Sequence, residues 1–283
     1  MQKAEKMQAL RVFAAEIRLE TLKTIGSLGF GHVGGSMSVV EALAVLYGEI
    51  MKVDPKNPRW EDRDWCVMSK GHAGPAMYAT LGLKGFYPIE QAYTLNKPHT
   101  NFPSHTDRLK TPGIDLTTGS LGQGISSAVG AALGNKMDER DNHVFVFVGD
   151  GESDEGQVWE AAQFAAHYKL DNLVCLVDDN KLQLDGKVSE VMGHAKGIGA
   201  KFDAFGWNVI NVENGNDVEQ IYDAVMSAYD CKGMPTCIVL NTTKGKGATF
   251  AESSGAHSSQ PTKEQWDEAI KTAEAELARV KAQ

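Results

Sequence analysis

Two polar side chains follow two successive apolar segments of this sequence. Asp150 stands between two glycines directly after HVFVFV, and Asn180 ends the stretch Asp-Asp-Asn that follows NLVCLV. If the segments are parallel strands joined by a helix, their carboxyl ends share one sheet edge, where such sheets bind ligands. Carboxylate and amide oxygens suit a hard cation such as Mg²⁺, which completes its shell with water and phosphate oxygens. The pattern predicts a metal ion that bridges to a diphosphate.

The glycines around Asp150 fit this chemistry but do not prove it. Gly149 and Gly151 allow the backbone to bend and a phosphate to come close. A single Gly-Asp-Gly after a strand is also typical of an ordinary turn. Asn180, at the distance expected for a βαβ unit, favours the metal site over the turn.

The surrounding chain alternates between β-rich apolar segments and helical ones. WNVINV and TCIVLN follow the first two predicted strands, and DVEQIYDAVMSAY has helical spacing between them. This alternation predicts an α/β fold with a doubly wound, mostly parallel sheet flanked by helices. Because the sequence contains no internal repeat, low-complexity segment or linker, we expect one domain over residues 1–283.

Local signals place further helices, a strand and a long loop. Apolar residues from Leu10 to Ile17 predict a helix that ends in the glycine-rich stretch 26–35. Ser38 with Glu41, and Thr262 with Gln265, are capping-box patterns that predict two more helix starts. DWCVMS predicts a short strand, TTGSLGQG a turn before a helix of small residues, and residues 85–115 a long loop of the kind that often carries function.

Composition excludes several classes of protein. A net charge of −9 and a pI near 5.4 leave no basic surplus for nucleic acid. We see no apolar run of membrane-spanning length, and charges interrupt the N-terminal residues where a signal peptide would be continuous. The four cysteines form no C-x-x-C pair, which indicates reduced packing residues. We expect a cytoplasmic protein without nucleic-acid or membrane partners.

Gly-Asp-Gly followed after a helix by Asp-Asp-Asn resembles the thiamine diphosphate fingerprint of transketolase-like enzymes. Four other stretches agree with that family and occur in its order: GHVGGS at 31–36, SKGHAGPAMYA at 69–79, TGSLGQG at 118–124 and KGKG at 244–247. The resemblance covers nearly the whole chain. Several independent motifs in one order are far more specific than any of them alone.

The resemblance implies roles for residues at the cofactor. Asp150 and Asn180 would be side-chain ligands of Mg²⁺, or of another divalent cation such as Ca²⁺ or Mn²⁺, and the carbonyl of Leu182 a third ligand. Lys244 would lie near the cofactor and the substrate. A lysine in an exposed turn is an equally good interpretation of this motif. The implied contacts to thiamine diphosphate are His72, Gly119, Leu121, Gly151, Glu155, Asn180, Lys244 and His257.

The resemblance also implies an active site rich in histidine. His32, His72, His105 and His257 match histidines that bind the diphosphate or the sugar and take part in proton transfer. Imidazole suits this task because its ordinary pKa lies near neutrality. The other four histidines, His99, His143, His167 and His194, are predicted to be structural.

Two acidic residues after the Gly-Asp-Gly motif resemble the family's acids at the subunit interface. Glu155 and Glu160 would link paired active sites, with Glu155 acting in catalysis and cofactor binding. A solvated helix face is the alternative for such carboxylates.

Two loops depart from the family pattern. Val33 follows His32, and Thr106 follows His105, where the family has proline. Each change removes a fixed φ angle from a loop expected at the rim of the substrate site. We therefore expect an unusual sugar substrate.

The resemblance also implies a missing half. The family promotes deprotonation of its cofactor with a glutamate from a second α/β domain of another chain, and a full-length transketolase is more than twice this long. We therefore expect the N-terminal subunit of a split transketolase. Its partner would be a separate C-terminal, pyrimidine-binding subunit in a two-plus-two assembly. The expected reaction moves a two-carbon ketol unit from a ketose, expected to be phosphorylated, to an aldose.

Other functions fit the sequence less well. The α subunit of a 2-oxoacid dehydrogenase carries the same fingerprint, and deoxyxylulose-phosphate synthase shares the fold, but TGSLGQG, SKGHA and the four histidines fit transketolases better. A non-catalytic scaffold is disfavoured by the full metal and diphosphate motifs. A nucleotide-binding dehydrogenase is disfavoured because GSLGQG does not follow the opening strand of a dinucleotide unit.

Overall fold

A five-stranded parallel sheet forms the centre of the computed structural model, which describes residues 2–252 and 260–283. The strand order is β1-β2-β3-β7-β6, and every neighbouring pair is parallel. The strands are β1 (Trp65–Met68), β2 (Val144–Gly149), β3 (Leu173–Asp179), β6 (Asn208–Val212) and β7 (Thr236–Asn241). The predicted mostly parallel α/β fold is confirmed.

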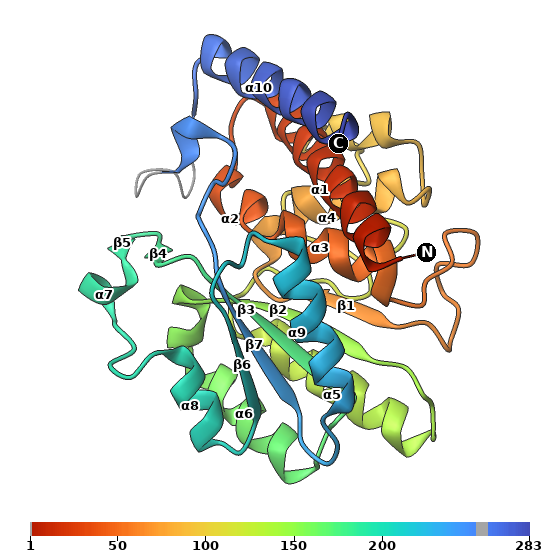
Figure 1. The fold of residues 1–283 in the computed structure, drawn as a ribbon, viewed down its shortest axis with the longest axis vertical. Helices are drawn as coiled ribbons and strands as arrows, with labels where there is room; N and C mark the ends of the chain where they lie inside the picture. The colour runs from red at the N-terminus through yellow and green to blue at the C-terminus, as the bar shows by residue number, and fades with distance from the viewer. Residues whose placement is uncertain (1, 253–259) are drawn as a thin grey trace.

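Helices cover both faces of the sheet (Figure 1). One layer contains α1 (Lys3–Gly26), α3 (Val40–Val45), α4 (Gly74–Leu83), α9 (Val218–Asp230) and α10 (Lys263–Lys281). The other contains α5 (Gln123–Met137), α6 (Gly156–His167) and α8 (Ile198–Ala204). The remaining segments are short: α2 (Val33–Met37), α7 (Val188–Val191), the π-turn η1 (Leu46–Ile50), the 3₁₀ turns η2 (Gly71–Ala73), η3 (Ile89–Thr94), η4 (Gly151–Asp154) and η5 (Thr249–Ala251), and the hairpin β4 (Leu182–Gln183) with β5 (Gly186–Lys187).

The strands read as continuous apolar runs because they bury side chains on both faces. Along β2, Phe145 and Phe147 belong to the core under α1, α3 and α4, whereas Val146 and Val148 belong to the core under α5 and α6. All four side chains are inaccessible to solvent. A strand with helices on both sides has no polar face to show, which is why the sequence lacks the alternation of a half-buried strand.

One predicted capping box is absent, although helix α3 begins nearby at Val40, and another is confirmed. Ser38 does not cap a helix; its hydroxyl donates to Asp178 Oδ2 at 2.7 Å, and Glu41 pairs with the buried guanidinium of Arg18. Buried polar contacts across the core therefore replace the predicted capping box. Thr262 and Gln265 do form one at the start of α10, where no buried partner competes.

The segment Val33–Ile50 is long and apolar enough, by length and composition, to cross a bilayer, which differs from the sequence expectation. In the fold it is 83% buried and divided among α2, α3 and η1. Its apolar character is explained by its place in the core beneath α1.

The predicted loop over residues 85–115 contains no strand and no α-helix, only the turn η3. Its end is anchored to the sheet, because Asp115 pairs with Arg63 and accepts from the amide of Cys66 at 2.9 Å. Tyr78 on α4 donates to the carbonyls of Pro103 at 2.8 Å and His105 at 3.1 Å. The loop is therefore held in place around His105.

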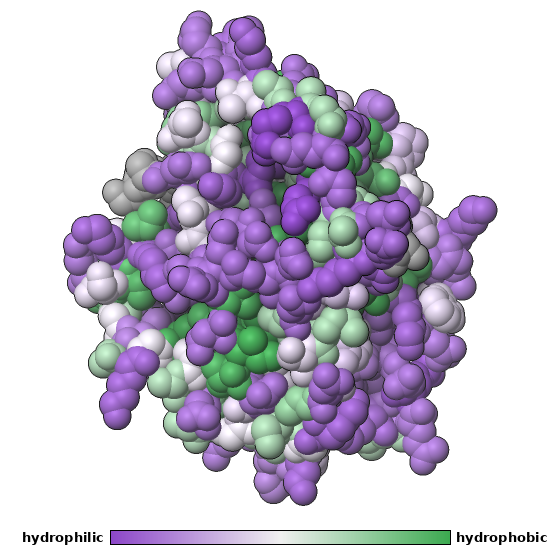
Figure 2. Space-filling model, in the orientation of Figure 1, coloured by the Kyte–Doolittle hydropathy of each residue, from purple (hydrophilic) through white to green (hydrophobic). Residues whose placement is uncertain are grey.

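The surface on one side of the molecule is mostly hydrophilic, as Figure 2 shows. An apolar patch lies over β6, β7 and α8, where Ile198, Val209 and Val239 line a hollow of about 380 Å³. β6 is the last strand on this side of the sheet. The hydrophobic core under α5 and α6 therefore comes close to the surface beside β6.

Two glycines of α5 should respond in opposite ways to substitution by alanine. A Cβ at Gly124 would lie 2.6 Å from the backbone Cα of Ser69, whereas a Cβ at exposed Gly130 would meet nothing within 4 Å. We expect Gly124→Ala to lower the free energy of unfolding by about 1–3 kcal/mol through overpacking. Gly130→Ala should raise it by about 0.5–1 kcal/mol because alanine favours the helix. Urea unfolding of both variants is the measurement, and equal effects would contradict the packing described here.

Candidate active site

A cavity of about 150 Å³ opens at the carboxyl ends of β2 and β3. It brings together residues from six separate parts of the chain. Seven residues predicted from the sequence line it: His72, Leu121, Asp150, Gly151, Asn180, Leu182 and Lys244. Gly35, Lys70, Gly149, Glu152, Gln183 and Leu184 complete the lining.

Asp150 lies where the sequence predicted, at the end of β2 and beside the chain that follows β3. Its amide donates to the carbonyl of Asp178 at 3.2 Å, and its carboxylate accepts from the amides of Gly151 and Lys181. Burial, followed by the nearby Asp178 carboxylate, raises the pKa of Asp150 to about 7. A divalent cation at this carboxylate would offset both effects.

Asn180 is oriented by a buried carboxylate that the sequence analysis did not single out. Its side-chain nitrogen donates to Asp178 Oδ2 at 2.8 Å, and its side-chain oxygen lies 3.2 Å from the amide of Leu182. The amide is therefore fixed with its oxygen away from Asp178. This orientation leaves an acceptor rather than a donor available at the metal position.

Asp178 and Lys70 form an ion pair at the base of the cavity. The two side chains are 0% and 2% exposed, and the ammonium of Lys70 also donates to the carbonyl of Gly35 at 2.8 Å. Ser38 and Thr242 donate to the same carboxylate. Burial acts to raise the pKa of Asp178, but the charge of Lys70 and these hydrogen bonds outweigh it and bring the pKa below its usual value.

Lys244 contacts the main-chain carbonyl of Leu182, which is the third predicted metal ligand. Its ammonium donates to the carbonyl of Leu182 at 2.8 Å. Burial, followed by the charge of Lys70, lowers the pKa of Lys244 to about 8, although Asp150 and Asp178 act in the opposite direction. The exposed turn lysine considered as an alternative is therefore wrong, because Lys244 is 3% exposed.

These groups fit a hard divalent cation. Among residues 2–252 and 260–283, no group of three or more His, Cys, Asp or Glu side chains is placed to hold a metal ion. Asp150, Asn180 and the Leu182 carbonyl instead offer one carboxylate, one amide and one main-chain oxygen, and an ammonium already occupies the carbonyl. Oxygen donors with a single carboxylate suit Mg²⁺ that completes its shell on a phosphate.

Three of the four predicted histidines form a cluster beside the cavity. The ring of His32 lies 5.3 Å from that of His72 and 5.7 Å from that of His105, measured between ring centres. Burial lowers the pKa of both His32 and His105, and the charges of His105 and Lys244 lower that of His32 further. Neutral imidazoles can accept protons from sugar hydroxyls near pH 7. His257 lies outside the described residues.

Two glycines lie beside this cluster, and a close backbone approach explains one of them. A Cβ at Gly35 would lie 2.8 Å from Nε2 of His72, so a side chain there would displace the imidazole. Gly119 has a φ of +159° and lies against His105, with a Cβ position 3.5 Å from Cδ2 of that ring. Gly119 therefore adjoins the histidine cluster rather than lining the cavity.

Glu155 and Glu160 lie apart from the cavity lining. Glu155 is the N-cap residue of α6, and both carboxylates are exposed. The structure brings Glu155 close to Gly122, where a Cβ would meet its side chain at 2.9 Å. Their predicted role at a subunit interface stays a prediction.

Sequence reasoning missed several residues at this site. Lys70 lies within the quoted SKGH stretch and Asp178 within Asp-Asp-Asn, so motif membership was the available signal. His194, predicted to be structural, is within 3.2 Å of the carbonyl of Asp150 and 2.8 Å of the ammonium of Lys201. No local pattern marked His194, because its contacts come from the fold.

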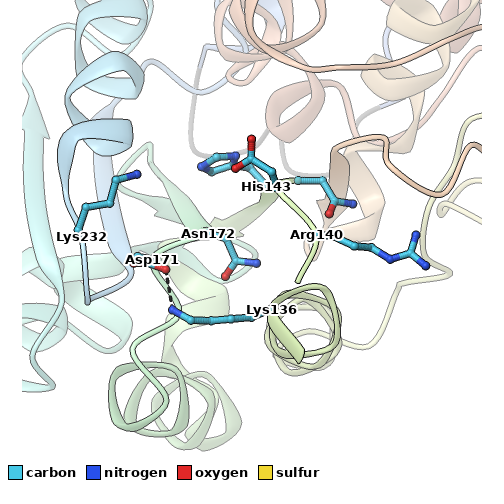
Figure 3. Close-up of a pocket in the computed structure, with 8 residues that line it drawn as sticks. Lys136, Arg140, His143, Asp171, Asn172 and Lys232 are labelled. Atoms are coloured by element: carbon cyan, nitrogen blue, oxygen red, sulfur yellow. Dashed lines mark hydrogen bonds and ion pairs between the residues drawn. The ribbon is translucent and has the colours of Figure 1, made fainter. Parts of the chain in front are cut away.

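Another hollow, of about 140 Å³, lies at the amino ends of β2 and β3, at the opposite end of these strands from the cavity (Figure 3). Lys136 pairs with Asp171 across it at 2.7 Å, and His143 packs against Tyr229 with ring centres 4.2 Å apart. Burial lowers the pKa of His143 to about 4, so this imidazole is neutral. These contacts agree with the structural role predicted for His143.

Comparison with known families decides what the motifs had suggested. Residues 10–275 match the family described as transketolase, thiamine diphosphate binding domain. The chain belongs to the transketolase family. It is 49% identical to the 6-deoxy-6-sulfo-D-fructose transketolase subunit SqwG of Clostridium sp. (strain MSTE9), over 97% of this chain and 100% of that protein. It is 38% identical to an apulose-4-phosphate transketolase subunit of Phocaeicola vulgatus, over 94% of each.

Full-length transketolases match over less than half their length. Transketolase 1 of Saccharomyces cerevisiae is 36% identical over 87% of this chain and 38% of the yeast protein. The solved transketolase of Campylobacter jejuni superposes with a TM-score of 0.87 at 29% identity, over 99% of this chain and 46% of that one. The chain is thus an N-terminal transketolase subunit that carries the thiamine diphosphate-binding domain.

Removing one partner of the buried ion pair should be costly. We expect Lys70→Met to lower the free energy of unfolding by about 3–5 kcal/mol, because Asp178 would stay buried without its counter-charge. The double variant Lys70→Met/Asp178→Asn should recover part of the loss. Removing Lys187 from its exposed pair with Glu190 is the control and should change nothing measurable. Similar losses for Lys70→Met and Lys187→Met in denaturant unfolding would contradict this assignment.

Asp150 should make the metal-free protein less stable as pH rises. Its folded-state pKa of about 7 lies above the ordinary 3.8, so its stabilising contribution is complete below pH 4 and is lost as pH rises through 7. Relative to Asp150→Asn, the wild type should therefore lose stability over that window. Mg²⁺ affinity should fall about tenfold for each pH unit below 7, because a proton competes for the carboxylate. Unfolding and calorimetric titrations at pH 4 to 8 test both, and a pH-independent difference between the two proteins would refute the assignment.

Proposed function

We propose that this chain binds thiamine diphosphate through a divalent cation and, with a separate C-terminal subunit, transfers a two-carbon ketol unit from a ketose to an aldose. The observation that carries this proposal is the convergence of Asp150, Asn180 and the Leu182 carbonyl on one cavity that adjoins the histidine cluster. The match to named transketolase subunits over essentially their full length supports the division into two subunits.

The protein groups have distinct tasks in this proposal. Asp150, Asn180 and Leu182 would hold Mg²⁺ or another hard divalent cation, and Gly151 and His72 would contact the diphosphate. When bound, thiamine diphosphate supplies the electron sink that allows a carbon–carbon bond beside a carbonyl to break. Lys244 donates to the Leu182 carbonyl and would have to release it to the cation, and its positive charge would then offset the negative charge of the diphosphate.

The histidine cluster would move protons during turnover. His32 and His105 have lowered pKa values and are neutral near pH 7, so each can accept a proton from a sugar hydroxyl and return it. His257 is proposed to join them. Val33 and Thr106, which replace the family's prolines, follow these two histidines and are proposed to alter which sugar fits.

A sulfonated ketose is the first donor to test. The relative at 49% identity is named for 6-deoxy-6-sulfo-D-fructose, whereas relatives at 38–39% are named for apulose 4-phosphate. Both names describe a ketose with an anionic end group. We propose that this chain takes the same class of donor, and that its partner subunit supplies the remaining contacts in a two-plus-two assembly.

The decisive experiment mixes this chain with a C-terminal transketolase subunit. Thiamine diphosphate and Mg²⁺ are supplied, with 6-deoxy-6-sulfo-D-fructose, apulose 4-phosphate, fructose 6-phosphate and pyruvate tested as separate donors. We expect two-carbon transfer only in the mixture, and Asp150→Ala in the mixture should reduce it by at least about a hundredfold because the metal loses its only carboxylate.

Three results would change the proposal. Turnover by this chain alone would remove the need for a partner. Consumption of pyruvate, without ketose turnover, would favour a 2-oxoacid dehydrogenase or a deoxyxylulose-phosphate synthase-like enzyme. Failure to bind thiamine diphosphate in the mixture would favour a scaffold without catalytic function.

A further inference from the structure

We propose that Glu152 is a positioning residue that holds three cofactor-binding segments in register. This inference rests on the cofactor-binding part of the proposed function. Glu152 follows the Gly-Asp-Gly turn by one residue, lies in η4 and is 3% exposed. It lines the cavity beside Asp150 and Gly151.

The carboxylate of Glu152 accepts from three donors on three different segments. Oε2 accepts from the amide of Gly149 at 2.9 Å, at the end of β2. Oε1 accepts from the amide of Gly122 at 2.9 Å, at the start of α5, and from the hydroxyl of Ser69 after β1. A single side chain therefore connects parts of the sequence that lie up to 83 residues apart.

Each of the three donors adjoins residues predicted to contact the cofactor or metal. Gly149 precedes Asp150, and Gly122 follows Leu121. Ser69 precedes Lys70 of the buried ion pair and lies three residues before His72. A shift at any donor moves one wall of the cavity.

The segment after β1 and the turn before α5 pack tightly together, so their positions depend on each other. A Cβ at Gly71 would lie 2.9 Å from the amide nitrogen of Gly119, so the segment after β1 and the turn before α5 are in direct contact. Gly122 has a φ of +80°, which residues other than glycine rarely adopt. Its amide direction is set by that conformation, and Glu152 is the acceptor it meets.

The three donors are satisfied only if both carboxylate oxygens of Glu152 accept hydrogen bonds. The amides of Gly149 and Gly122 can only donate, so Oε2 and Oε1 of Glu152 must each accept a hydrogen bond. A glutamine has the same shape, yet its NH₂ group would face either Gly149 or the Ser69 and Gly122 pair, donor against donor. Glu152→Gln thus disturbs the register without creating a void.

Asp64 offers a matched control. It directly precedes β1, so it lies at the opposite end of this strand from Ser69. It is 1% exposed, and it accepts from the amides of Lys52 and His143 at 2.7 Å each, beside the hollow of Figure 3. Asp64→Asn therefore removes a buried carboxylate with two backbone hydrogen bonds, as Glu152→Gln does, but far from the cofactor segments.

The test is the dissociation constant of thiamine diphosphate, measured by calorimetry in saturating Mg²⁺ on the complex of each variant with the C-terminal subunit. We expect Glu152→Gln to weaken binding about tenfold to a hundredfold, as loss of an outer-shell partner does at metal sites. Asp64→Asn should leave affinity within about twofold of wild type, although both variants should melt at a lower temperature. Ser69→Ala, which removes one of the three donors, should weaken binding by a smaller factor.

The outcomes separate this inference from the proposed function. Wild-type affinity in Glu152→Gln, or equal losses in Glu152→Gln and Asp64→Asn, would overturn the positioning role. If Glu152→Gln does not fold, Ser69→Ala decides, and unchanged affinity there overturns the role as well. A wild-type complex that binds no thiamine diphosphate would instead contradict the proposed function.

Discussion

The ion pair between Lys70 and Asp178 is the interaction on which the active-site edge of this protein depends. Both side chains are removed from water, so each charge requires the other and requires further hydrogen bonds. Ser38, Thr242 and Asn180 donate to Asp178, and the carbonyl of Gly35 accepts from Lys70. The pair thereby ties β3 to the segment after β1, to the chain after β7 and to the junction of α2 with α3.

This arrangement has a direct consequence for metal chemistry. Asp178 is neutralised by Lys70 and turns the amide of Asn180 so that its oxygen stays available. Asp150 accepts from the backbone amides of Gly151 and Lys181, and these hydrogen bonds do not offset its burial, so its pKa stays raised. Two neighbouring carboxylates at the same sheet edge therefore differ in purpose: one belongs to the scaffold, and the other is suited to a cation.

Glu152 plays a comparable part on the other side of the cavity. Asp178 organises donors from the core, whereas Glu152 organises the backbone amides of Gly122 and Gly149 and the hydroxyl of Ser69. Both carboxylates are buried and both meet several donors, so the rigid part of the site is built from acceptors whose lone pairs are already used within the protein. In the histidine cluster, by contrast, the ring of His72 lies close against the backbone of Gly35.

The sequence by itself determined the fold class, the family and seven of the residues that line the cavity. Those signals are local: an acid or amide directly after an apolar run, and short motifs in a known order. The sequence could not determine the partners of Ser38, Glu41, Lys70, Asp178 and Glu152, and it misassigned Ser38 with Glu41 as a helix cap. Ser38 and Lys70 lie 140 and 108 residues from Asp178, and Ser69 lies 83 from Glu152. Only the tertiary structure decided these contacts, because a buried charge is stabilised by whichever donors the packed strands and loops bring to it, and no spacing along the chain records that choice.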